Sequence, residues 1–354
     1  MLHENQLNLL RHLARFNLLA YEDCLTMLDV DGTGDRTALS YAFRPLTKHK
    51  YVSKRENGCV SILAKGKHLF PEIVPLISTG GGEAGQRRVM VVSRMAALME
   101  RNGIPAFDER QERDDPYFIP SACWREIAPG ILSTTRFTGM LMAGKRRLAV
   151  YDIGDGNMEW QVRAEGSLFY TKYGSYETKA TGMLFVCREK ARVKAAQSII
   201  RQTMWYRRHL LREQCVERDK PTKWSRSPIK LKAEYEHVYL TTPERLQSAI
   251  WRIVDEDQYI EALRNENDGV LSGSMGIGDI EAHPRRLFVN PACDLLKFVR
   301  FFAAVKTHLT PKEEDHYYTP INLEIYIHKE DKPIVEMYPK LNKLEGWKIG
   351  VYRS

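Results

Sequence analysis

The sequence has few of the features that mark secreted, membrane-spanning or metal-binding proteins. Its six cysteines include no CxxC pair, and no apolar run approaches the roughly 18 residues of a membrane span. The ten histidines show no metal-ligand spacing. The first residues lack the basic region and apolar segment of a signal peptide. We therefore expect a cytoplasmic protein with free thiols, no cofactor and no membrane partner.

Several motifs of well-known enzyme classes are also missing. The glycine-rich loop at 273–278 lacks the Gly-Lys-Ser/Thr of a P-loop, and no Gly-x-Ser-x-Gly elbow occurs. A relaxase that nicks DNA through tyrosine would need a His-hydrophobic-His metal motif, and no such triplet accompanies Tyr317 and Tyr318. These absences disfavour nucleotide binding, serine hydrolysis and tyrosine-mediated nicking.

Positive charge is present and is concentrated in two segments. The 354 residues carry a net charge of +8, but segment 36–67 alone holds eight Lys/Arg and one acidic residue. Segment 185–232 holds fourteen Lys/Arg and four acidic residues, so the remainder of the chain is net acidic. Clustered positive charge of this kind indicates a polyanionic partner, and nucleic acid is the usual one.

The first 75 residues show the pattern of three helices followed by a hairpin. One helical face carries Leu2, Leu9, Leu13, Phe16 and Ala20. A short helix over 21–28 precedes a turn, and Asp35 stands at the N-cap of a third helix over 36–48. In that third helix we expect Ala38, Ala42 and Leu46 to be buried. Two β-prone runs, 51–55 and 59–63, flank Asn57-Gly58, a strong hairpin signal.

This order of elements is typical of a winged helix-turn-helix domain. A helix fits the major groove of DNA, where outward polar side chains reach base edges while a basic wing contacts phosphates. The candidate base-reading residues on the third helix are Arg36, Thr37, Ser40, Arg44 and Lys48. The candidate phosphate contacts are Lys50, Lys54 and Arg55. A winged helix that binds protein rather than DNA remains an alternative.

The middle of the chain has the pattern of an α/β core. After a glycine-rich linker, a helix is predicted over 87–102, followed by strands at 131–135, 137–142, 147–152 and 181–187. A long helix over 190–213, a strand at 237–241 and a helix capped by Thr242 come next. The remaining residues show an apolar helix over 291–308 and a strand pair around 329–332.

Several short motifs in this order resemble the replication-relaxation family of plasmid and integrative-element proteins. They are Ser93-Arg-Met-Ala-Ala-Leu-Met99, Phe137-Thr-Gly-Met-Leu141, Val150-Tyr-Asp-Ile-Gly-Asp-Gly156, Lys172-Tyr173 and Met183-Leu-Phe-Val-Cys187. The resemblance implies a winged helix joined to a domain similar to restriction endonucleases. It also implies a role in plasmid replication or conjugative mobilisation.

The chain departs from this family at the acidic motif of the nuclease-like domain. Where family members commonly carry a Pro-Asp pair, this sequence reads Phe137-Thr138-Gly139, and only Asp152 remains of a Glu-x-Asp motif. A nuclease of this class needs two or three carboxylates to hold Mg²⁺ beside the scissile phosphate. The candidates for such a site are Asp152, Asp155 and Lys172. The weakened motif favours a non-catalytic domain, and a Mg²⁺-dependent nuclease or nickase stays as the alternative.

The sequence thus predicts a mixed α/β protein that binds specific sites in double-stranded DNA of a bacterial mobile element. The domains expected are a winged helix (1–75), a linker (76–86), a restriction-endonuclease-like α/β domain (87–255) and a C-terminal α/β extension (256–354). The second domain would add contacts to the DNA backbone through Arg207, Arg208, Lys223 and Arg226. The sequence does not distinguish a replication initiator from a relaxosome accessory protein or a regulator. It also does not distinguish a monomer from a homodimer. Other replication or transfer proteins are further candidate partners.

Overall fold

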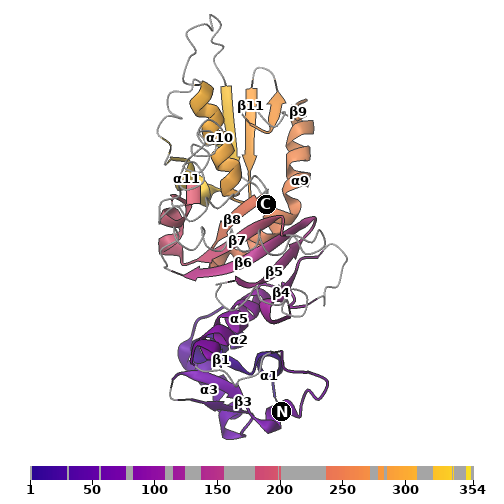
Figure 1. Cartoon of the computed structure of the whole chain (residues 1–354), viewed down its shortest axis with the longest axis vertical. Coiled ribbons are helices and arrows are strands. Elements are labelled where there is room, and N and C mark those ends of the chain that lie inside the picture. The colour runs from indigo at the N-terminus through magenta and orange to yellow at the C-terminus, as the bar shows by residue number, and fades with distance from the viewer. Residues whose placement is uncertain are drawn as a thin grey trace, which may run out of the picture. The chain divides into compact units, whose positions relative to one another are not determined.

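The protein was analysed as a computed structural model, which describes most of the chain. The described residues are 2–29, 32–55, 57–76, 83–107, 115–123, 137–154, 180–197, 199–200, 237–271, 278–282, 285–308, 322–336, 338 and 348–351. The fold is mixed α/β, with helices and three sheets (Figure 1). The chain divides into two compact units, Met1–Leu141 and Met142–Ser354.

The N-terminal part of the first unit packs helices against a three-stranded sheet. Its elements are α1 (Glu4–Phe16), β1 (Leu18–Ala20), α2 (Tyr21–Leu28), α3 (Arg36–Lys48), β2 (Val52–Lys54), β3 (Cys59–Ile62) and α4 (Ala64–Lys67). The sheet order is β1-β3-β2, with both pairings antiparallel. Leu9, Leu13, Leu25 and Leu46 lie in one buried cluster, which joins the three helices to the sheet.

The first helix is shorter than its apolar pattern predicts. It ends at Phe16 because Asn17 adopts a left-handed conformation, with φ of 61°. Ala20 therefore belongs to β1, which pairs with β3, and not to the helix. The expectation that Ala20 continues the helical stripe was wrong, because three residues of β1 gain ladder hydrogen bonds from a strand that lies 40 positions later.

The second and third helices have the predicted bounds. The Asp35 side chain accepts hydrogen bonds from the backbone N–H groups of Thr37 and Ala38 and so caps α3. The buried face of α3 differs from the expected one: Phe43 and Leu46 are buried, whereas Ala38 is exposed and Ala42 is half-buried. Phe43, a larger side chain, packs in the core where helical spacing predicts Ala38 and Ala42. The hairpin turn is formed around Gly58, with φ of 78°.

Removing the cap of α3 should destabilise the first unit moderately. Asp35→Ala leaves the N–H groups of Thr37 and Ala38 without their side-chain partner, so we expect a loss of about 1 kcal/mol in the free energy of unfolding. Urea denaturation followed by circular dichroism measures the loss. Asp35→Asn, which can still accept, should retain most of the stability. Equal losses in the two variants would contradict the capping role.

Helix α5 (Glu83–Arg101) packs against α1, α2 and β1 of the first unit. Its link to α1 is polar and buried: His12 Nδ1 lies 2.9 Å from Glu100 Oε2, and His12 Nε2 lies 3.0 Å from Ser93 Oγ. These groups follow the order of a catalytic triad. However, Ser93 is fully buried and His12 nearly so, which closes them to a substrate. The arrangement therefore fastens two helices together.

A five-stranded sheet follows, in the order β4-β5-β6-β7-β8. Its strands are β4 (Tyr117–Pro120), β5 (Phe137–Ala143), β6 (Arg146–Gly154), β7 (Gly182–Cys187) and β8 (His237–Thr241). Strands β6, β7 and β8 run parallel, and every residue of β7 is buried, as its apolar run predicts. The predicted strand at 131–135 lies outside the described residues.

The rest of the second unit holds the third sheet and its helices, in the order β13-β12-β11-β10-β9. The strands are β9 (Val270–Leu271), β10 (Ile280–Ala282), β11 (Arg285–Asn290), β12 (Asn322–Ile327) and β13 (Lys348–Val351). The α-helices are α9 (Leu246–Glu266), α10 (Leu295–His308) and α11 (Lys332–Glu336). Three 3₁₀ turns are present: η1 (Glu189–Ala191), η2 (Pro243–Arg245) and η3 (Lys329–Asp331).

One expectation for this part of the chain needs correction. The strand pair predicted around 329–332 was wrong, because η3 and α11 follow β12, which instead pairs in parallel with β11 and β13. The domain boundaries expected from the sequence stay a prediction. Residue 255 lies within α9, and α5 belongs to the first of the two compact units. No helix in the described part of the chain is long and apolar enough to span a membrane.

Candidate nucleic-acid interface

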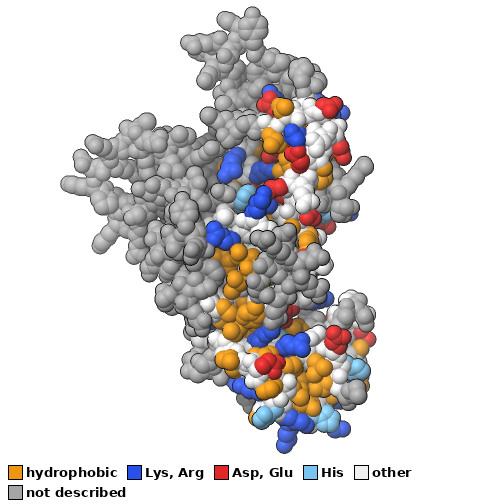
Figure 2. Space-filling model, turned by 90° about the vertical axis from the view of Figure 1, so that its right-hand side faces the viewer, with side chains coloured by type: hydrophobic (Ala, Val, Ile, Leu, Met, Phe, Trp, Pro, Cys, Tyr) orange, Lys and Arg blue, Asp and Glu red, His pale blue; other side chains and the backbone are white. Residues whose placement is uncertain are grey.

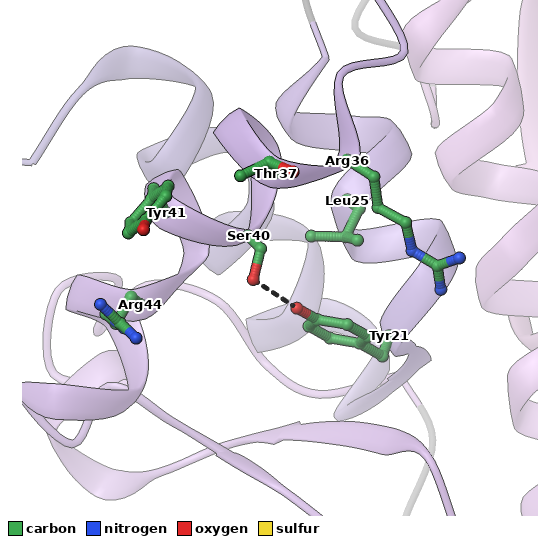
Figure 3. A pocket seen from close by; sticks show the side chains of 7 residues that line it. All are labelled: Tyr21, Leu25, Arg36, Thr37, Ser40, Tyr41 and Arg44. Atoms are coloured by element: carbon green, nitrogen blue, oxygen red, sulfur yellow. Dashed lines mark hydrogen bonds between the residues drawn. The ribbon is translucent and has the colours of Figure 1, made fainter.

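Four of the five α3 residues predicted to read DNA, Arg36, Thr37, Ser40 and Arg44, lie around a shallow pocket, and Lys48 is not among its lining residues (Figure 3). The pocket has a volume of about 350 Å³ and is lined by Tyr21, Leu25, Arg36, Thr37, Ser40, Tyr41 and Arg44. Thr37, Ser40 and Arg44 were predicted as members of the outward face of α3, and all three are exposed. Two tyrosines, Tyr21 and Tyr41, complete the pocket and were not predicted.

Arg36 differs from the other cations of α3. Its guanidinium forms an ion pair with Glu22 of α2, and both side chains are mostly exposed. Such a surface pair contributes little stability, but it holds Arg36 beside an acidic group that would repel a phosphate. Arg36, predicted to read bases, is therefore already paired with a carboxylate of a neighbouring helix.

Tyr21 links α3 to the hairpin. Its hydroxyl lies 3.4 Å from Ser40 Oγ, as Figure 3 shows. Lys54 Nζ of β2 lies 3.5 Å from the centre of the Tyr21 ring, and Phe43 contacts the ring edge-on at 5.1 Å. One aromatic side chain thus fixes a polar group of α3 and a cation of the hairpin relative to each other.

Tyr41 is the most exposed aromatic residue on α3, with 62% of its surface accessible. The Arg44 guanidinium lies 5.3 Å from the centre of its ring. Thr37, Tyr41, Arg44 and Lys48 are spaced by three or four residues, so they share one helical face. This spacing could have identified Tyr41 from the sequence, since it lies between two residues already chosen.

Exposed cations continue from the end of α3 onto the hairpin and α4. Lys48, Lys50, Lys54 and Arg55 are exposed as predicted. Lys65, Lys67 and His68 are also exposed and were not predicted. Within the described residues, no carboxylate forms an ion pair with Arg44, Lys48, Lys50 or Lys54. In Figure 2, Lys, Arg and His side chains gather at the lower end of the N-terminal unit.

The predicted site in the second unit is described only at one residue. Asp152 is half-buried in β6, and its Oδ1 accepts a hydrogen bond from the Gly154 N–H at 3.2 Å. Asp155 and Lys172 lie outside the described residues, as do Arg207, Arg208, Lys223 and Arg226. Among the residues that are described, no group of three His, Cys, Asp or Glu side chains lies together as metal ligands would.

No family model, curated protein or solved structure matches this chain.

Proposed function

We propose that the chain is a double-stranded DNA-binding protein, with the first unit acting as a winged helix-turn-helix. In this proposal α3 enters the major groove and the β2–β3 hairpin is the wing. The element order from α1 to β3 and the sheet order β1-β3-β2 support this assignment. A helix of 13 residues spans about 20 Å, long enough to lie along several base pairs of the groove.

The observation that carries the proposal is a continuous series of exposed cations across α3 and the hairpin, for which the described part of the chain provides no carboxylate partner. Arg44 and Lys48 occupy the outer face of α3, while Lys50, Lys54 and Arg55 follow on the hairpin side. Surface cations without carboxylate partners repel each other, and a polyanion relieves that repulsion. Thr37, Ser40 and Tyr41 stand among these cations and supply hydroxyl groups that can reach base edges.

The short motifs between Ser93 and Cys187 extend the proposal to a biological role. We infer that the protein recognises a site on a bacterial mobile element, as part of plasmid replication, conjugative transfer or their regulation. The sequence motifs from Ser93 to Cys187 support this role. Asp152 is the one carboxylate of the nuclease-like motif in the described part of the chain. We therefore include no catalytic step in the proposal.

The salt dependence of DNA binding tests the proposal directly. If Lys48, Lys50, Lys54 and Arg55 each neutralise one phosphate, the logarithm of the binding constant should fall with the logarithm of salt concentration with a slope of about −3.6. Fluorescence anisotropy with a labelled duplex at several salt concentrations measures this slope. A slope near zero, or no binding at low salt, would overturn the proposal and favour a winged helix that binds protein.

A further inference from the structure

Three strand-to-helix junctions of the second unit share one construction. After β7, β8 and β12 the chain passes through a single residue and a three-residue 3₁₀ turn before a helix begins. Strands β7 and β8 are parallel neighbours, so their carboxyl ends lie at one edge of a sheet. In open α/β sheets, ligands bind outside the carboxyl ends of the strands. The side chains of these junctions were not assigned any role above.

Charged side chains from the three junctions meet. Arg192, after η1, donates to the Glu330 carbonyl at 3.0 Å and forms a buried ion pair with Asp331. Arg245, at the end of η2, pairs with Glu189 at 2.7 Å and with the Glu330 carboxylate at 2.9 Å. Two guanidinium groups from separate junctions therefore flank one residue, Glu330 of η3.

Several buried polar atoms at these junctions make no hydrogen bond to a described residue. They are Arg192 Nε, Thr242 Oγ1, Arg245 Nη1 and His328 Nδ1. Only 6% of the Arg192 side chain is exposed, and Thr242 is fully buried. Thr242 stands at the N-cap of η2, yet its hydroxyl makes no capping bond. A buried donor without an acceptor is destabilising, so such atoms are rare and point to a missing partner.

Guanidinium groups act on the titratable side chains of the junctions, where the carboxylates of Glu189, Glu330 and Asp331 also lie. Burial and the nearby guanidinium groups of Arg252 and Arg245 lower the pKa of His328 to about 4, so its ring is neutral at pH 7. Burial raises the pKa of Cys293 to about 11, against the opposing effect of Arg192, Arg252 and Arg245. The first residues of the 21-residue helix α9 add the positive end of a helix dipole.

We propose that this junction cluster, formed by Arg192, Thr242, Arg245 and Glu330, is a binding site for a phosphate group. Arg192 Nε and Thr242 Oγ1 are buried in the ligand-free protein, so they donate to a phosphate oxygen only once the Glu330 carboxylate has been displaced. Glu330 is 34% exposed, and its carboxylate holds Arg245 in the ligand-free protein. A phosphate displaces that carboxylate and pairs with Arg245 in its place. Asp331 is buried and stays with Arg192.

Neighbouring threonines provide a matched test on the full-length protein. Thr242→Val removes the hydroxyl without a partner, whereas Thr241→Val removes an equally buried hydroxyl that already donates to the Thr242 carbonyl at 3.4 Å. Isothermal titration with inorganic phosphate, at constant ionic strength, should show binding to the parent protein and to Thr241→Val. Binding to Thr242→Val should be at least about tenfold weaker. Undetectable binding to the parent, or equal binding to the two variants, would overturn the proposal.

Variants of the charged partners should shift affinity in opposite directions. Arg245→Gln removes a ligand and should weaken phosphate binding, whereas Glu330→Gln removes the internal competitor and should strengthen it. Loss of binding in Glu330→Gln would contradict the displacement step. Repeating the titration with duplex DNA present identifies the source of the phosphate. Competition by DNA assigns the site to the nucleic-acid backbone, and its absence assigns the site to a small phosphorylated ligand.

Discussion

Replacing Arg44, Lys48 and Lys54 together with alanine should lower the affinity for duplex DNA by about 100-fold or more. In the proposed binding mode, Arg44 contacts a base edge, and the two lysines add positive charge at the groove and the wing. All three side chains are on the surface, so their removal leaves the core of the first unit intact. Anisotropy at one fixed salt concentration measures the loss. The slope of the salt dependence should become shallower as well.

A charge-matched control separates this site from the general basicity of the protein. Lys145, Lys194 and Lys332 are exposed cations of the second unit, and replacing all three with alanine changes the net charge by the same amount. We expect affinity to stay within about threefold of the parent value, because these lysines belong to neither α3 nor the hairpin. Similar losses in the two triple variants would show that binding follows net charge rather than the α3 face.

Local signals in the sequence predicted α2, α3 and the hairpin well. Asp35 caps a helix and Gly58 forms a turn, and each acts on residues within a few positions. These elements can therefore be predicted without tertiary information. Strand β1 could not be predicted in this way. It has three residues, and it exists because β3 offers ladder partners from a distant part of the chain. The strand pair predicted around 329–332 was wrong for the same reason, since β12 pairs with β11 and β13.

The candidate interface shows the same division between local and tertiary information. Thr37, Ser40 and Arg44 follow from helical spacing on α3 alone. Tyr21 belongs to another helix, and its place beneath Lys54 and beside Ser40 depends on how α2 packs against α3 and the hairpin. The pairing of Arg36 with Glu22 also joins two helices. Sequence spacing therefore identified several outward-facing side chains of α3. It did not identify which of them contact residues of other elements.

A buried charge network in the second unit was equally invisible in the sequence, where Asp255-Glu256-Asp257 suggests a solvated helix face. Only 3% of the Glu256 side chain is exposed. It contacts Arg146 at 3.0 Å, Lys297 at 3.4 Å and the Tyr239 hydroxyl at 3.3 Å. Burial opposes the charge on Lys297, but Asp279 and Glu256 outweigh it and raise the pKa of that amine. The carboxylate thus holds two cations from β6 and α10.

Glu256→Ala should lower the free energy of unfolding by about 3 kcal/mol, because Arg146 then keeps only the exposed Asp257 as a counter-ion and Lys297 keeps only Asp279. The neighbouring residue supplies the control. Asp257 contacts the same Arg146 at 3.1 Å, but 61% of its side chain is exposed. Asp257→Ala should therefore cost less than about 1 kcal/mol, as surface ion pairs do. Urea denaturation of both variants measures the difference. Equal losses would mean that burial does not decide the strength of these pairs, and a negligible loss in Glu256→Ala would mean that water already solvates the network.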